Sequence, residues 1–216
     1  MYETLIDELR QTNTQLIAVS KTKPATAILE LYNKGQRLFG ENYVQELTEK
    51  QPQLPADIQW HFIGHLQSNK VKYIAPFVHT IQSVDSLRLV QEINKQAQKN
   101  NRTINCLLQF HISDEITKFG FSLDEAQEMF SGNAPETFKN INWCGVMGMA
   151  TFTDDKNQVR QEFQSLKNIF DKIKSEFFPA SPDFKEISMG MSDDYKMAIE
   201  LGATMVRIGS LLFGKR

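Results

Sequence analysis

The sequence contains little cysteine, and its two cysteines are poorly placed for cross-linking or metal binding. Cys106 and Cys144 are the two among 216 residues, and both lie inside apolar segments. This excludes a disulfide framework and a CxxC zinc site, and it is typical of a protein in a reducing compartment. Glycine and proline are also few, at 11 and 7 residues, which excludes a fibrous or disordered chain. We therefore expect an ordinary globular protein.

An excess of charge of either sign is missing as well. Lys plus Arg total 24 and Asp plus Glu total 26, which gives a formal net charge of -2 at pH 7. A nucleic-acid-binding or membrane-surface protein would show a basic excess or stripe, so neither partner is expected. No stretch nears the length needed to cross a bilayer, and the amino terminus, MYETLIDELRQ, lacks the apolar run of a signal peptide. The expected location is cytoplasmic.

What the sequence does contain is a strand-helix unit that recurs along the chain. An opening helix at 1–11 is followed by short apolar runs, each followed in turn by a segment of helical periodicity or by a loop. Strands that are apolar throughout indicate a parallel sheet covered by helices, and eight such strands close a (β/α)8 barrel. We predict a single α/β domain over 1–216, a TIM barrel with an extra amino-terminal helix; an open doubly wound sheet is the alternative. The predicted strands are Gln15–Ser20, Arg37–Gly40, Gln59–Ile63, His79–Ser83, Ile104–Ile112, Trp143–Met147, Phe184–Met189 and Met205–Ile208, and the predicted helices between them are Ala25–Lys34, Tyr43–Lys50, Asn69–Ile74, Leu87–Asn100, Leu123–Phe130, Lys156–Phe177 and Asp194–Leu201.

The residues just past each strand are where a barrel builds its site. The last two of these loops combine glycines with hydroxyls: Gly190 and Ser192 follow the seventh strand, and Gly209 and Ser210 follow the eighth. Backbone N–H groups at glycines, serine hydroxyls and helix amino ends bind phosphate, and this fold often uses these two loops for it. The alternative interpretation is a pair of glycine turns with helix-capping serines.

Lys21 stands at the end of the first strand, and Arg207 lies within the last. A lysine at the inward end of an apolar strand can lose solvation and act as an amine nucleophile toward an aldehyde; the alternative is a lysine whose ammonium stays in water. A reactive lysine beside a phosphate site indicates a sugar-phosphate aldolase or pyridoxal 5'-phosphate (PLP). A buried arginine requires an anion or acceptor, here either a cofactor ring nitrogen or a carboxylate inside the barrel.

No metal site is expected. His61 and His65 are four residues apart, but they fall on a strand and its exit rather than on one helix face, and no carboxylate follows in the HExxH manner. Four methionines near the strand ends could line a flat ligand but are more often core filler: Met147, Met149, Met189 and Met191.

Five strings stand in order along the chain: LIAVSKTKP (Leu16–Pro24), FGENYVQE (Phe39–Glu46), WHFIGHLQSNK (Trp60–Lys70), ISMGMSDD (Ile187–Asp194) and TMVRIGSLLFG (Thr204–Gly214). Together they resemble the pyridoxal phosphate homeostasis proteins, the YggS/PROSC family, from the first strand to the last. Five separated motifs are far more specific than a lone glycine-rich loop. The resemblance implies a barrel like the amino-terminal domain of bacterial alanine racemase, with PLP held as a Schiff base.

The resemblance also implies roles for single residues. Lys21 corresponds to the Schiff-base lysine, and Arg207 to the arginine that faces the pyridine nitrogen. An arginine there disfavours protonation of the ring, which weakens the electron sink that most pyridoxal enzymes need, so it fits a carrier better than a catalyst. The remaining implied contacts are Asn42 near the cofactor and, at the phosphate, Ser192, Gly209 and Ser210.

Two positions depart from the family pattern. His65 stands where proline is usual in GPLQSNK, and His111 stands where asparagine is usual, in FHISDEITKFGF. Both positions are expected in the barrel mouth, so they bear on loop shape and ligand preference more than on cofactor binding. Lys118, Phe119 and Gly120 match the K-x-G element of the family, to which no role is assigned.

Three functions remain open from the sequence. The first is a non-enzymatic carrier that stores, buffers and delivers PLP to PLP-dependent apoenzymes. The second is a PLP-dependent amino-acid racemase, which needs a base on each face of the cofactor; in alanine racemase the second base comes from a carboxyl-terminal β-domain, and this chain ends eight residues after Ile208. The third is a lysine-dependent aldolase with Glu41 as its acid or base. We favour the carrier, acting as a monomer in PLP homeostasis.

Overall fold

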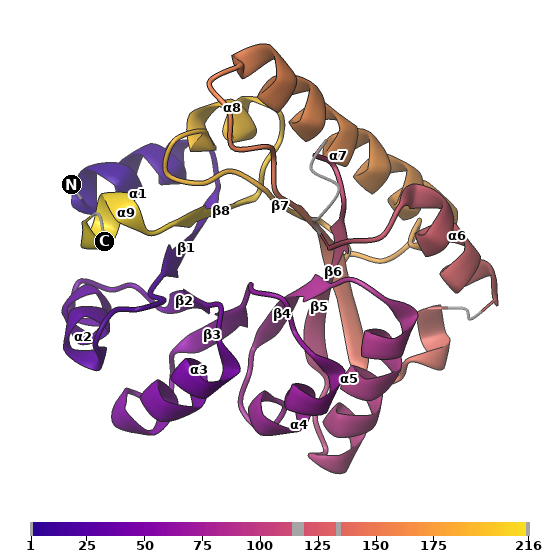
Figure 1. The fold of residues 1–216 in the computed structure, drawn as a ribbon, viewed down its shortest axis with the longest axis horizontal. Coiled ribbons are helices and arrows are strands. Elements are labelled where there is room, and N and C mark those ends of the chain that lie inside the picture. Colours follow the sequence, from indigo (N-terminus) through magenta and orange to yellow (C-terminus); the bar gives the residue numbers. More distant parts are fainter. Residues whose placement is uncertain (1, 114–118, 133–134, 215–216) are drawn as a thin grey trace.

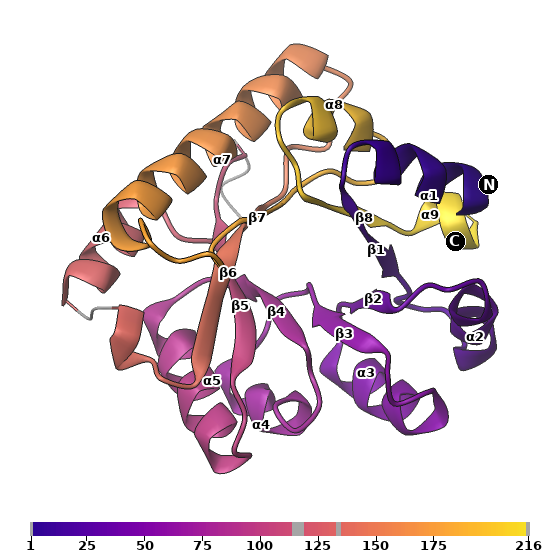
Figure 2. The same cartoon turned by 180° about the vertical axis from the view of Figure 1, so that it is seen from behind.

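The computed structural model describes residues 2–113, 119–132 and 135–214, and it contains a closed barrel of parallel strands. Each strand pairs with the next along the chain, and β1 pairs with β8 to close the barrel. Figure 1 shows the helices outside the strands, and Figure 2 shows the same arrangement from behind. The strands are β1 (Gln15–Val19), β2 (Leu38–Glu41), β3 (Gln59–Phe62), β4 (Thr80–Val84), β5 (Ile104–Phe110), β6 (Ile141–Gly148), β7 (Glu186–Ser188) and β8 (Met205–Ile208).

The helices follow the strands in the predicted alternation, with one helix ahead of β1. This confirms the (β/α)8 barrel with an extra amino-terminal helix, and the closed strand order excludes the open doubly wound sheet. The described helical segments are α1 (Tyr2–Gln11), α2 (Ala25–Asn33), α3 (Val44–Lys50), η1 (Gln51–Gln53), η2 (Ser68–Lys70), α4 (Val71–Ile74), α5 (Leu87–Lys99), α6 (Leu123–Gly132), η3 (Pro135–Thr137), α7 (Lys156–Phe177), α8 (Tyr195–Glu200) and α9 (Ser210–Phe213).

Five strands differ in length from their predicted spans: β1 and β3 by one residue, β5 by two, and β6 and β7 by three. β7 covers three residues. Phe184, which was predicted to begin this strand, lies outside it, and its ring stacks on Phe178 at a centroid distance of 4.3 Å. β6 begins earlier than predicted, because the amide of Asn142 donates to Asn105 Oδ1 at 2.9 Å on the neighbouring strand. Asn142 is thus a polar residue inside a strand, and from the sequence alone it resembles a loop residue.

Side chains are buried on both faces of the strands. In β1, Leu16 and Ala18 join the layer between sheet and helices, whereas Ile17 joins a smaller cluster with Leu107 and Met147. Because side chains alternate between the two faces of a strand, this smaller cluster lies in the barrel interior, where it is accompanied by buried polar side chains. Burial on both faces explains why the strands read as continuous apolar runs.

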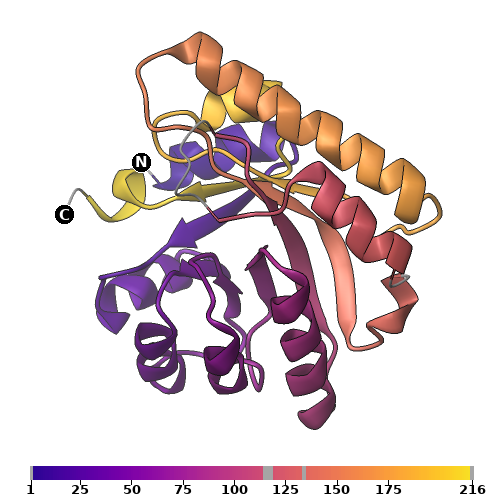
Figure 3. The same ribbon diagram turned by 45° about the vertical axis from the view of Figure 1, so that its right-hand side comes forward.

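The longest described helix, α7, shows how the outer layer is fixed. Asp155 accepts hydrogen bonds from the backbone N–H groups of Asn157 and Gln158 at 2.9 and 3.2 Å, which caps the first turn. Buried positions such as Phe163 and Phe170 then recur on one face. Figure 3 shows α7 along the outside of the barrel, where it contacts β6 and β7.

The added helix α1 is packed into the outer layer. The Tyr2 hydroxyl donates to Gln36 Oε1, and the Tyr195 hydroxyl donates to Glu8 Oε2, both at 3.1 Å. Figures 1 and 2 show α1 beside α9, so the two ends of the described chain lie close together. None of the described helices combines the length and the apolar character that a membrane crossing requires.

Candidate functional site

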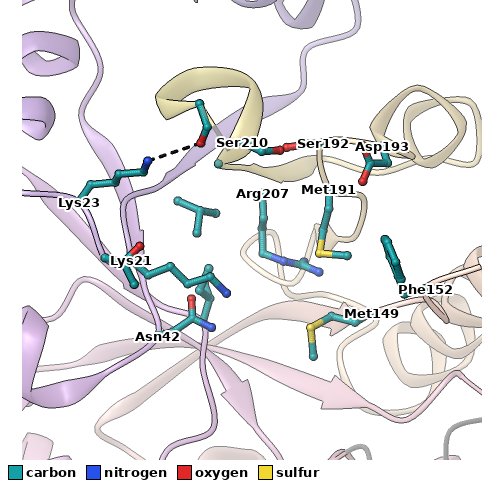
Figure 4. A pocket seen from close by; sticks show the side chains of 15 residues that line it. Lys21, Lys23, Asn42, Met149, Phe152, Met191, Ser192, Asp193, Arg207 and Ser210 are labelled. Carbon is teal, nitrogen blue, oxygen red and sulfur yellow. Dashed lines mark hydrogen bonds between the residues drawn. The ribbon is translucent and has the colours of Figure 1, made fainter. Parts of the chain in front are cut away.

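A cavity of about 270 Å³ opens among the loops that follow the strands. This is the end of the barrel where proteins of this fold carry their sites. In Figure 4, Lys21 and Asn42 lie on one side, Met149 and Met191 lie on the other, and Arg207 lies between them. The structure brings all six predicted residues to the lining of this one cavity, namely Lys21, Asn42, Ser192, Arg207, Gly209 and Ser210.

Lys21 enters the cavity from the loop after β1. The strand ends at Val19, and Thr22 adopts a left-handed backbone conformation with φ of 64°. Figure 4 shows the Lys21 side chain extending into the cavity toward Asn42. Lys21 is half-buried there, which favours the inward-facing lysine over one whose ammonium lies in open water.

Asn42 follows β2 at a point where two loops nearly touch. A Cβ atom at Gly64 would lie 2.2 Å from the carbonyl oxygen of Asn42, so the loop after β3 requires glycine. The side-chain Oδ1 of Asn42 is buried, and no described residue bonds to it. Buried polar atoms normally have a hydrogen-bond partner, so this acceptor marks a place for one.

Arg207 reaches the cavity from β8 and is almost fully buried. Its Nη1 donates to Ser188 Oγ at 2.7 Å, and its Nη2 donates to the carbonyl of Gly148 at 2.9 Å. Burial lowers the pKa of Arg207 to about 10, and the charge of Asp194 opposes that effect. The guanidinium therefore stays protonated at neutral pH. Its described hydrogen-bond partners are a hydroxyl and a carbonyl rather than the carboxylate that the sequence left open.

The contacts of Arg207 continue through the barrel interior. Ser188 Oγ donates to Gln82 Oε1 at 2.7 Å, and Gln82 Nε2 donates to His61 Nδ1 at 2.8 Å. Because Gln82 Nε2 is only a donor, His61 carries its proton on Nε2. Gln82 was missed from the sequence, where it is one of several polar residues in the predicted strand His79–Ser83.

The loops after β7 and β8 contribute Ser192, Gly209 and Ser210. The residues that cap α8 and α9 are Asp194 and Gly209, and neither cap has a side-chain hydrogen bond. The helix-capping alternative for the two serines is therefore wrong. A Cβ at Gly209 would lie 3.2 Å from the carbonyl oxygen of Val19, so glycine lets this loop approach β1. Ser192 and Ser210 therefore line the cavity without capping a helix.

The side opposite Lys21 carries three large apolar side chains and the exposed Asp193. Met149 and Met191 line the cavity, as does Phe152, which is 86% exposed. Met147 is instead buried in the barrel interior. Phe152 was not identified from the sequence, although it closely follows the sixth strand, where a lining residue is expected.

The two departures from the family pattern lie beside the cavity rather than in its lining. His65 Nδ1 is 3.1 Å from Asp85 Oδ2, and the His65 ring stacks on Phe119 at a centroid distance of 3.8 Å. The backbone N–H of His111 donates to the carbonyl of Phe121 at 3.1 Å. The His65 side chain thus packs against the loop that carries Phe119, whereas the contact of His111 is made by its backbone. Lys118 of the K-x-G element falls outside the described residues.

Glu41 does not line the cavity. It is fully buried beneath the loop that carries Lys21, where its Oε1 accepts from Ser20 Oγ at 2.6 Å and from Lys50 Nζ at 2.8 Å. The aldolase hypothesis therefore loses the acid or base that it requires.

The fold and the site together define a class of protein: a barrel built like the amino-terminal half of alanine racemase, with a lysine after its first strand. The family model described as "Alanine racemase, N-terminal domain" matches residues 2–216. Relatives named "Pyridoxal phosphate homeostasis protein" include one from Aquifex aeolicus, 40% identical over 94% of this chain and 87% of that protein. One from Homo sapiens is 38% identical over 94% of this chain and 76% of its own. The chain belongs to the pyridoxal phosphate homeostasis protein family.

Solved structures agree with this assignment. PipY of Synechococcus elongatus, solved with PLP bound, matches with a TM-score of 0.86 and 32% identity over 97% of this chain and 98% of that chain. An alanine racemase of Clostridium difficile matches with a TM-score of 0.75 and 16% identity, over 99% of this chain and 59% of the racemase. The racemase comparison shows the shared barrel fold alone.

Proposed function

We propose that this chain is a PLP-binding protein of pyridoxal phosphate homeostasis, which stores and buffers PLP and delivers it to PLP-dependent apoenzymes. In this proposal Lys21 holds the cofactor as a Schiff base, and 1–216 acts as a single PLP-binding barrel domain. The observation that carries it is the convergence of Lys21, Arg207 and two serine-bearing loops on one cavity. The names of the relatives and the PLP bound in PipY support it.

The residues of the cavity fit this cofactor in their chemistry. The Lys21 amine suits an aldehyde, and the hydroxyls of Ser192 and Ser210, on loops that also carry glycines, suit a phosphate. The buried Oδ1 of Asn42, which no described residue satisfies, gains a possible partner when a polar ligand fills the cavity. The thioether of Met149 offers an apolar, polarizable contact for a flat ring.

Arg207 favours holding the cofactor over using it catalytically. Bound PLP supplies an aldehyde and a pyridine ring that accepts electrons from a reacting substrate. An arginine is only a donor, and with a pKa of about 10 it is charged at neutral pH. A ring nitrogen that faces it stays unprotonated, which makes the ring a weaker electron sink. We therefore propose a non-catalytic carrier.

Amino-acid racemisation is the second candidate function, because the barrel is shared with alanine racemase. A racemase places a base on each face of the cofactor. In Figure 4 the side chains across the cavity from Lys21 are Met149, Met191, Phe152 and Asp193. A thioether or a phenyl ring cannot accept a proton at neutral pH, and the Asp193 carboxylate, which can, is exposed. We propose slow side reactions at most, because the three large side chains opposite Lys21 are apolar and the Asp193 carboxylate is exposed.

The first experiment is an absorption spectrum of the purified protein with added PLP, before and after borohydride reduction, followed by peptide mapping. We expect a visible Schiff-base band that reduction traps on Lys21 and that Lys21→Ala abolishes. If no band appears after PLP is added, or if reduction attaches PLP to surface lysines alone, the cavity serves another ligand.

Further assays separate the carrier from the enzyme. A carrier transfers PLP to an apoenzyme and shows negligible turnover of free amino acids, whereas a racemase interconverts their enantiomers. Light scattering tests the proposed monomer. The proposed cytoplasmic setting is supported by Cys106 and Cys144, which are separate thiols in the structure.

A further inference from the structure

The loop that carries Lys21 lies against a group of charged side chains, two of them buried and the third, Glu46, half-buried. Lys50 and Glu46 come from α3, and Glu41 comes from the end of β2. Lys50 Nζ is 2.8 Å from Glu41 Oε1 and 2.5 Å from Glu46 Oε1. The side chains of Lys50 and Glu41 are 8% and 0% exposed, so solvent screens this pair little.

This charged group bonds to the backbone on both sides of Lys21. Lys50 Nζ donates to the carbonyl of Ser20 at 2.8 Å, and that carbonyl belongs to the peptide unit preceding Lys21. The N–H of Thr22, in the peptide unit following Lys21, donates to Glu46 Oε1 at 2.5 Å. A residue has two soft dihedral angles, and they relate its two flanking peptide planes. Fixing both planes therefore fixes the direction in which Lys21 leaves the backbone.

Other contacts hold the same loop in a conformation that it would not adopt unaided. The Ser20 hydroxyl donates to Glu41 Oε1 at 2.6 Å, and the Ser20 N–H donates to the carbonyl of Gly40 at 3.0 Å. Thr22 is a β-branched residue with φ of 64°, a conformation that is unfavourable for such residues. The bond from its N–H to Glu46 compensates for that strain.

Burial explains why three ionisable groups occur together here. Burial raises the pKa of Glu41, while Lys50 and the Ser20 hydroxyl oppose that effect. A buried carboxylate needs a cation and hydrogen bonds, and Lys50 supplies them to Glu41 and Glu46 at once. The same ammonium then has one donor left for the Ser20 carbonyl.

We propose that Glu46 and Lys50 are positioning residues for Lys21, which aim its amine at the cofactor aldehyde by fixing the two peptide planes around it. The inference rests on the proposed function, because it assumes that Lys21 is the Schiff-base lysine. It makes a specific distinction: loss of Glu46 impairs the bond to the aldehyde and spares binding of the phosphate and ring, which depends on Ser192, Ser210 and Arg207.

The test compares Glu46→Ala with Glu49→Ala. Both residues lie in α3, both changes have the same effect on helix propensity, and the described side-chain bond of Glu49 is to Gln45 within that helix. Two probes are used: PLP, followed by its visible band and by borohydride trapping on Lys21, and pyridoxine 5'-phosphate, which has an alcohol in place of the aldehyde, followed by calorimetry.

For Glu46→Ala we expect Schiff-base formation to be about tenfold slower, the size of one hydrogen bond to a charged group. Its affinity for pyridoxine 5'-phosphate should stay within about twofold of wild type, as should both properties of Glu49→Ala. Equal rates in the two variants would overturn the inference, and so would an equal loss of both probes in Glu46→Ala. Wild-type protein that traps no PLP on Lys21 would instead refute the proposed function itself.

A second variant covers the case in which Glu46→Ala unfolds. Glu46→Gln keeps the size of the side chain and an acceptor for the Thr22 N–H, but it loses the charge that faces Lys50. We expect an intermediate effect, about threefold slower Schiff-base formation, with circular dichroism unchanged. An unchanged rate in this variant would also contradict the positioning role.

Discussion

The buried histidine at the centre of the barrel predicts a specific loss of stability in acid. His61 is 1% exposed, its Nδ1 accepts from Gln82 at 2.8 Å, and its ring stacks on His79 at a centroid distance of 5.7 Å. Burial, with a smaller contribution from the charge of His79, lowers the pKa of His61 to about 3. The folded protein therefore keeps this imidazole neutral over the whole mildly acidic range.

The sign and size of the effect follow from the difference between the folded and unfolded states. An unfolded histidine has a pKa of about 6.5, so below that pH the unfolded chain binds a proton that the folded chain does not. The free energy of unfolding therefore falls as the pH drops from 6.5 toward 3. From pH 7 to pH 5, His61 alone lowers it by about 2 kcal/mol, and the full loss of about 5 kcal/mol is reached only below pH 3.

Urea unfolding of wild type and His61→Gln at pH 7 and pH 5, followed by tryptophan fluorescence, measures this contribution. The carboxyl groups are common to both proteins, so their titration cancels in the difference. We expect wild type to lose about 2 kcal/mol more than the variant between the two pH values. His65→Gln keeps His61 and should retain the extra loss. Equal acid losses in wild type and His61→Gln would show that His61 is not held neutral by burial.

Two further predictions concern the strands around the site. A Cβ at Gly145, where φ is 150°, would lie 1.9 Å from the Glu186 carbonyl oxygen; Gly145→Ala should therefore lower the urea unfolding free energy by more than about 3 kcal/mol. Gly132→Ala, which meets nothing within 4 Å, is its control. Ser188→Ala removes an acceptor from the buried Arg207, and we expect a loss of about 1–3 kcal/mol in the same assay; an unchanged midpoint would mean that water replaces the hydroxyl.

Most of the barrel could be predicted because its information is local. The predicted span of α7 agrees with the structure at both ends, since a capping aspartate, helical periodicity and a following loop lie within one stretch of sequence. β7 is the contrary case: Phe184 is apolar because it stacks on Phe178, and strand pairing cannot be distinguished from ring packing in a single sequence. The lengths of β6 and β7 depend on neighbouring strands, which local patterns do not include.

The site divides in the same way. Lys21 and Ser210 were found because they directly follow apolar strands, and the ends of the strands meet at one mouth. Glu46 and Lys50 were not identified from the sequence, because charged residues four apart on a short helix usually indicate a solvated face. Ser188 was missed as well, because its partner Gln82 lies 106 residues away.

The two chemically distinct sides of the cavity are therefore supported by separate polar networks. Lys21 is held from β2 and α3 through two carboxylates and an ammonium. Arg207 is instead held from β4, β6 and β7 through neutral hydroxyl, amide and carbonyl groups. A charged network around Lys21 restrains its backbone while the amine remains at the cavity. Among the described residues, the hydrogen-bond partners of the Arg207 guanidinium are neutral rather than carboxylates. Its positive charge therefore acts on the ligand that occupies the cavity. Substitutions in one network should thus affect one side of the cavity, and combined variants from the two networks should have nearly additive effects, because the networks share no residue.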